Sequence, residues 1–294
     1  MDYIHTIFGT LVLGLLCLSC GSEDHLLPSG LDKNYFEAPG DATDAESVLR
    51  REFFTKNGSY LIFNDTLHRE LKGTDEEGNP LYTYELLDIG YGMTSISSNR
   101  YAYDYLKTID EKKIAVTFLE NRIMPVITEA LRPYSVLVTQ LVKESVQKYG
   151  EWTTSNIDFY WGMRTLAIAL SGIENMTEKQ QAVLADRIVE GIVRQKVNAL
   201  GNNYLTEFYK PGENYYEVSR SKFPSISDVK TIGFLSSPTY TFPKKSVDLE
   251  AYLNAFFSQT EEEFMLENKD YPVVQEKYRA LKEAIKKIGF NVVR

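Results

Sequence analysis

The chain has 294 residues, of which 43% are hydrophobic and 25% are charged, and its formal net charge at pH 7 is −9. This composition is typical of a globular protein, and the length suits one large domain or two small ones. The acidic balance, with no basic cluster, argues against nucleic acid and anionic membrane surfaces as partners. The 20 Tyr and 15 Phe residues are first of all core residues, although an aromatic face that binds sugars or peptides remains an alternative.

The N-terminus carries a short apolar segment that ends at a small residue, Ser19, and a cysteine, Cys20. A bilayer-spanning helix needs roughly 20 apolar residues, whereas a run of about a dozen is typical of the core of a signal peptide. A cysteine directly after the small residue is the pattern of a bacterial lipoprotein. We therefore predict a lipoprotein signal peptide over residues 1–19 and lipidation, including palmitate, at Cys20. The alternative is a buried apolar helix with two ordinary cysteines.

The residues after Cys20 predict where the protein is anchored. Glu23 and Asp24 resemble the acidic surface-export signal of Bacteroidota lipoproteins, which indicates an outer-membrane protein that faces the cell exterior. The lipid would anchor the chain to the membrane without crossing it. Residues 20–46 contain Pro, Gly and acidic residues with little periodicity, and we interpret them as a lipidated flexible tether. Residues 47–294 are then a single domain with no cysteine for a disulfide, a thiolate nucleophile or a metal ligand.

Hydrophobic periodicity and turn residues predict the elements of this domain in chain order. Thr177 and Gln180 can form a capping box at the start of the clearest helix, and Gly201 is a plausible stop. Because strands and helices do not alternate strictly, the pattern predicts an α+β fold. Helices are expected over 45–54, 110–131, 177–201, 247–257, 261–266 and 271–287, and strands over 59–64, 81–91, 134–142 and 157–170.

The three histidines limit the possible chemistry. His5 would leave with the signal peptide, His25 lies in the tether, and His68 lies in a loop-like stretch. A Ser-His-Asp triad or a histidine-rich zinc site would have to use His25 or His68, and neither has a recognisable context. Phosphate-binding loops, nucleophile elbows and EF-hand loops are also missing. Asp65–Leu67 resembles the acceptor sequence of Bacteroidota O-glycosylation, which would modify Thr66.

Several segments together resemble one protein family. They are SYLIFN, PYSVLV, and the C-terminal stretches IGFLSSPTYTF, SVDLEAYLNAF and YRALKEAIKKIGFNVVR. Their order resembles the zinc metallohydrolase-like lipoproteins that accompany starch-utilisation-type nutrient importers of Bacteroidota. The resemblance implies a zincin-like metallohydrolase scaffold, with a small mixed sheet and a helical C-terminal part.

The active site of that family does not survive in this sequence. The family uses His-Glu-x-x-His on a helix, where two imidazoles bind zinc and the Glu is the general base. Aligning the helices places RIVEGIVRQ over the motif, with Arg187 and Gly191 at the ligand positions and Ile188 at the base position. The resemblance also implies an acidic position on a later helix, which is Asp248 in this sequence. The resemblance thus implies a degenerate member without zinc; the alternative is an ordinary core helix in an unrelated fold.

Three classes of function remain. The first is a non-catalytic surface lipoprotein of a nutrient import system that binds a glycan or peptide or docks to a transporter complex. The second is an active hydrolase, either a glycosidase that uses two carboxylates or an atypical zinc metallohydrolase. The third is a structural accessory whose partner is another protein. We favour the first, with Cys20 as its lipidation site and no catalytic residue.

Overall fold

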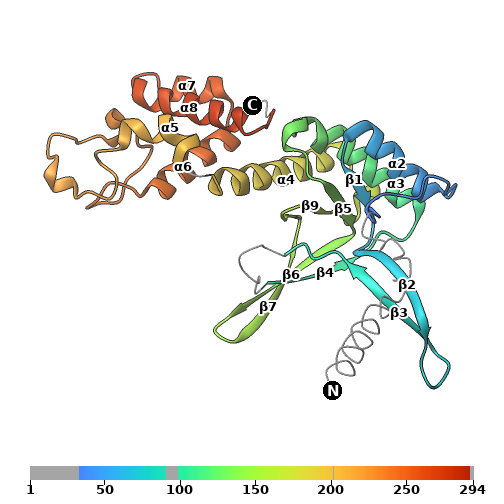
Figure 1. Cartoon of the computed structure of the whole chain (residues 1–294). Coiled ribbons are helices and arrows are strands. Elements are labelled where there is room, and N and C mark those ends of the chain that lie inside the picture. The colour runs from blue at the N-terminus through green and yellow to red at the C-terminus, as the bar shows by residue number, and fades with distance from the viewer. Residues whose placement is uncertain (1–32, 91–98, 201, 292–294) are drawn as a thin grey trace, which may run out of the picture. The chain divides into compact units, whose positions relative to one another are not determined.

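The computed structural model describes residues 33–90, 99–200 and 202–291 (Figure 1). The chain divides into a short N-terminal unit, Met1–Tyr35, and a large unit, Phe36–Arg294, which holds every element below. The predicted signal peptide and Cys20 lie outside the described residues. The α-helices are α2 (Ala45–Asn57), α3 (Ile109–Phe118), α4 (Glu178–Asn198), α5 (Thr206–Tyr209), α6 (Lys245–Ser258), α7 (Glu261–Glu267) and α8 (Pro272–Lys287). The strands are β1 (Tyr60–Ile62), β2 (Thr66–Thr74), β3 (Pro80–Leu86), β4 (Arg100–Asp104), β5 (Ser135–Thr139), β6 (Leu141–Lys148), β7 (Glu151–Ile157), β8 (Phe159–Trp161) and β9 (Thr165–Ala169).

The central sheet is mixed, in the strand order β1-β5-β9-β8. β1, β5 and β9 run parallel, whereas β8 pairs antiparallel with β9 at the edge. Every residue of β5 (SVLVT) and of β9 (TLAIA) is buried, as expected of inner strands that are covered on both faces. The predicted α+β class is confirmed, with a small mixed sheet and a helical C-terminal part.

Two of the predicted strands are each split into two. The segment predicted over 134–142 divides at Gln140 into β5 and β6, which belong to different sheets. The segment predicted over 157–170 turns at Gly162, so that β8 and β9 pair with each other. At Gly162 a Cβ atom would lie 2.4 Å from the carbonyl oxygen of Ile89. A glycine therefore permits this turn to pack directly against the segment after β3.

The other two sheets are small and antiparallel, and β2, β3 and β7 in them are largely exposed. β2 and β3 form a two-stranded antiparallel ribbon, and β4, β6 and β7 form a three-stranded sheet. The sequence did not predict β2, β4 or β7. The exposed, mostly polar side chains of β2 and β7 lack the alternation of apolar residues by which a half-buried strand is detected. β4 is only five residues long, although Tyr101 and Tyr103 alternate in it and pack against the smaller core cluster.

The predicted helix over 110–131 is α-helical only as far as Phe118. Thr108 and Glu111 form a capping box at its start, and a π-helical turn follows at Leu119–Ile123. Pro125 then lies in a short 3₁₀ turn, because proline cannot donate the backbone hydrogen bond of a continuing helix. The remaining short helical turns are 3₁₀ helices at Met124–Val126, Glu129–Leu131, Ile173–Asn175, Asn202–Leu205, Lys210–Gly212, Arg220–Lys222 and Val229–Ile232.

The two faces of the central sheet belong to different hydrophobic clusters. Val136 and Val138 of β5 point into the larger cluster, which also contains apolar residues of α3, α4, α6 and α8. Leu137 points to the other face and packs with Phe36 and Ile89 in a smaller cluster. This is the two-residue alternation of a β-strand with both faces covered. Among the described residues, no helix is both long and apolar enough to cross a membrane.

The large unit begins earlier than residue 47, the start predicted from the sequence. Phe36 and Ala38 are buried. Arg50 of α2 donates hydrogen bonds to the carbonyl oxygens of Phe36 and Leu61, at 3.0 and 2.8 Å. Arg51 donates to the carbonyl oxygens of residues 39 and 42. These bonds fasten the end of the predicted tether to α2, so the compact unit starts at Phe36.

Candidate functional site

Helix α4 carries the aligned motif positions and starts where the sequence predicts. Its N-cap is Thr177, which forms a capping box with Gln180. An apolar stripe then packs into the core, and Ile188, at the base position, belongs to that stripe and is fully buried. A buried isoleucine can neither exchange a proton nor bind an ion, so this position contributes packing alone.

The two ligand positions on α4 face β8 and the residue before it. A Cβ atom at Gly191 would lie 2.3 Å from Cε1 of Phe159, so the Phe159 ring fills the space that a histidine side chain would need. Arg187 forms a two-pronged ion pair with Asp158, with Nε–Oδ2 at 2.5 Å and Nη2–Oδ1 at 3.1 Å. Both side chains remain partly exposed, and the guanidinium is a cation that cannot ligate a metal.

The side chain of Asp248 bonds to other residues than those of α4. It is buried on α6, where Lys277 of α8 donates to its Oδ2 at 2.5 Å and the Tyr216 hydroxyl donates at 2.6 Å. Among the described residues, no hydrogen bond or ion pair joins Asp248 to Arg187, Ile188 or Gly191.

The Asp248–Lys277 pair is enclosed by aromatic rings. Lys277 is fully buried, and its Nζ lies 4.6–5.9 Å from the ring centroids of four aromatic residues. Burial raises the pKa of the Asp248 carboxyl and lowers the pKa of the Lys277 ammonium group, while the attraction between the two opposes both changes. This arrangement is an internal ion pair of the C-terminal part. The four aromatic residues around Lys277 Nζ are Phe208, Tyr216, Phe234 and Tyr252.

The described part of the chain contains no cluster of three His, Cys, Asp or Glu side chains that could hold a metal ion. His68, the one histidine within it, lies on β2 opposite Glu85 of β3. His5, His25 and the lipidation residue Cys20 lie outside the described residues. Thr66, the predicted glycosylation residue, is exposed at the start of β2, where its backbone N–H donates to Asn64.

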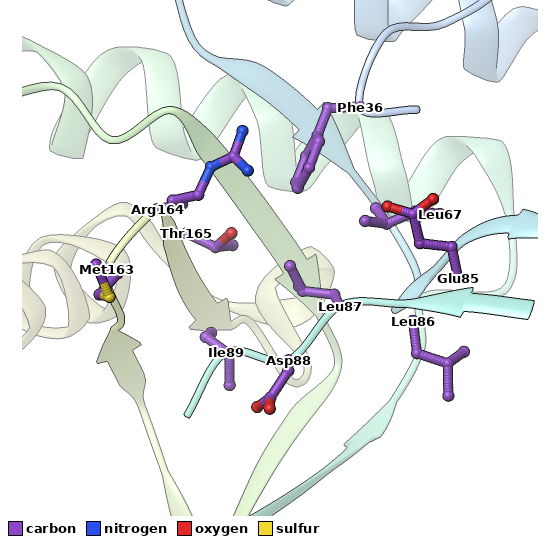
Figure 2. A pocket seen from close by; sticks show the side chains of 10 residues that line it. All are labelled: Phe36, Leu67, Glu85, Leu86, Leu87, Asp88, Ile89, Met163, Arg164 and Thr165. Carbon is purple, nitrogen blue, oxygen red and sulfur yellow. The ribbon is translucent and has the colours of Figure 1, made fainter. Parts of the chain in front are cut away.

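A pocket with a volume of about 320 Å³ lies beside the central sheet (Figure 2). In this view Met163, Arg164 and Thr165, which lead into β9, line one side, and residues at the start of β2 and the end of β3 line the other. Phe36 completes the wall and also lines a second, smaller cavity beside α2. The lining residues are Phe36, Leu67, Glu85, Leu86, Leu87, Asp88, Ile89, Met163, Arg164 and Thr165.

The pocket is mostly apolar but carries charges of both signs. Arg164 lies over the ring of Tyr134, 4.3 Å from its centroid, and 5.3 Å from that of Phe36. Glu85 and Asp88 supply two carboxylates. Within the described residues, none of these three charged side chains forms an ion pair. Sequence reasoning missed this site because its walls come from four segments that are far apart in the chain, and no local pattern marks them.

Comparisons with protein-family models, with curated proteins and with solved structures give no match to this chain.

Proposed function

We propose that this chain is a non-catalytic, metallohydrolase-like accessory protein of a nutrient import system, which binds a glycan or a peptide at the cell surface. One observation carries the non-catalytic assignment. At the aligned motif positions, residues of a neighbouring segment contact α4: the Phe159 ring occupies the space beside Gly191, and Arg187 pairs with Asp158. Both ligand positions are therefore used for contacts within the fold.

The proposed relationship to the zincin-like scaffold is supported by the element order. The segment aligned with the motif, 187–195, is helical throughout, and this helix follows the last strand of a small mixed sheet after one short 3₁₀ turn. The C-terminal part is helical, as the resemblance implies. The binding role is supported by the pocket in Figure 2, whose mostly apolar walls and few charged groups are typical of ligand sites.

The zinc content of the purified full-length protein, measured by elemental analysis before and after zinc loading, tests the non-catalytic assignment. We expect no stoichiometric zinc in either sample and no cleavage of a casein digest, because imidazole ligands are missing from both aligned positions. About one zinc per chain, or peptide cleavage that a chelator stops, would contradict the proposal and favour an atypical zinc metallohydrolase.

The proposed anchor is tested separately at Cys20. A Cys20→Ala variant should leave the membrane fraction and lose incorporation of labelled palmitate, while a Cys17→Ala variant, as the matched control, should keep both. Labelling that persists in Cys20→Ala would refute lipidation at this residue. Protease treatment of intact cells then distinguishes the proposed exterior location from a periplasmic one.

A further inference from the structure

The walls of the pocket in Figure 2 favour an apolar side chain over a sugar ring. They are largely aliphatic: in Figure 2, Leu67 and Leu87 lie on one side, Met163 lies on the other, and Ile89 lies below Thr165. The hydroxyl of Thr165, the uncharged polar side chain of the lining, already pairs with Ser135 Oγ at 2.7 Å. A saccharide needs many hydrogen-bonding partners for its hydroxyl groups, and few are available here.

The lining of the pocket carries charges of both signs. The rings of Tyr134 and Phe36 support the Arg164 guanidinium, whose planar donors match a carboxylate. Glu85 and Asp88 are both exposed carboxylates of the same lining, but they point to different sides in Figure 2. Asp88 Oδ1 already accepts a hydrogen bond from the backbone N–H of Gly90 at 3.1 Å, so Glu85 is the carboxylate left for a ligand. The Arg164 cation and the Glu85 anion, neither of them ion-paired among the described residues, complement a ligand that itself carries both charges.

We infer that this pocket binds short free peptides with an apolar side chain, through both charged termini of the peptide. The peptide carboxylate pairs with Arg164, the α-ammonium group faces Glu85, and the apolar side chain packs against Phe36 and the aliphatic wall. A volume of about 320 Å³ lies at the small end of ligand pockets, which suits a peptide of very few residues. The inference rests on the proposed binding function and specifies the class of its ligand.

Isothermal titration of the full-length protein in mild detergent tests this assignment, with the dipeptide Leu-Leu as the probe. We expect Leu-Leu to bind. Its analogue with an acetylated N-terminus and an amidated C-terminus should bind with an affinity lower by a factor of about ten or more. Arg164→Gln should weaken Leu-Leu binding about tenfold and leave the blocked analogue unchanged. Arg279→Gln, which removes an exposed arginine of α8, is the matched control and should change neither.

Three results would overturn the inference: no binding of Leu-Leu, equal binding of the blocked analogue, or displacement of Leu-Leu by maltotriose. Circular dichroism of each variant confirms that it is folded. Mass spectrometry of the recovered dipeptide separates this inference from the proposed function. Intact peptide without binding refutes the ligand class alone, whereas cleaved peptide refutes the non-catalytic assignment.

Discussion

Replacing Lys277 by methionine should strongly destabilise the protein. The substitution leaves the Asp248 carboxylate buried with the Tyr216 hydroxyl as its one remaining donor among the described residues. Removing one partner of a buried ion pair costs about 3–5 kcal/mol, because the other charge stays out of water. With a urea dependence of about 2–3 kcal/mol per molar, the unfolding midpoint should fall by roughly 1–2.5 M.

The loss of unfolding free energy in Lys277→Met should be larger at high pH than at low pH. Burial already raises the pKa of Asp248 above its ordinary value of 3.8, and loss of the Lys277 charge raises it further. A carboxyl whose native pKa is raised contributes stability that is complete below pH 3.8 and is lost as the pH rises through the raised value. The Lys277→Met penalty is therefore expected to be largest near pH 8 and to shrink towards pH 4.5.

Urea unfolding followed by tryptophan fluorescence at both pH values measures this effect. The double variant Asp248→Asn/Lys277→Met lacks both charges but keeps an oxygen for Tyr216, so it should recover most of the stability at pH 8. Lys286→Met, at an exposed position of α8, is the matched control and should change the unfolding free energy by less than about 0.5 kcal/mol. A Lys277→Met penalty below about 1 kcal/mol, or one that is independent of pH, would refute the argument.

Three further substitutions test the packing around α4. Gly191→Ala should cost about 1–3 kcal/mol in thermal unfolding, because its Cβ would overlap Phe159, and a second change, Phe159→Leu, should recover part of that loss. Arg187→Gln should cost under about 1 kcal/mol in the same assay, because its pair with Asp158 is largely exposed. Thr177→Ala should cost about 1 kcal/mol, measured by urea unfolding, because it removes the N-cap of α4; an unchanged midpoint would contradict the capping role.

The sequence predicted the elements that are marked by local chemistry. The capping box of Thr177 and the apolar stripe after it located α4, and Thr260 and Glu263 cap α7 in the same way. Runs of buried β-branched and aliphatic residues located β5 and β9. The points at which predicted strands divide were missed, because Gln140 is not a breaker and the turn at Gly162 depends on contact with Ile89, which is remote in the chain.

The candidate site could be predicted only in part. The spacing of Arg187 and Gly191 puts them on one side of α4, and the structure shows that this side faces β8 and the residue before it. The neighbour that fills the Gly191 space, Phe159, comes from another strand and has no local signal. Asp248 was linked to α4 through the family resemblance, yet its bonds are to Tyr216 and Lys277. Pairings across long stretches of chain are tertiary properties, which single-sequence patterns do not encode.

The hydrogen bond from Arg50 to Phe36 connects the pocket with the chain that precedes it. Phe36 is both the first residue of the large unit and a wall of the pocket, and its carbonyl oxygen is held by Arg50. If the protein is held at a surface through the chain that precedes Phe36, tension on that chain acts first on this wall. A ligand packed against the Phe36 ring would add contacts that resist peeling, so the pulling force that the attachment withstands would rise with occupancy of the pocket.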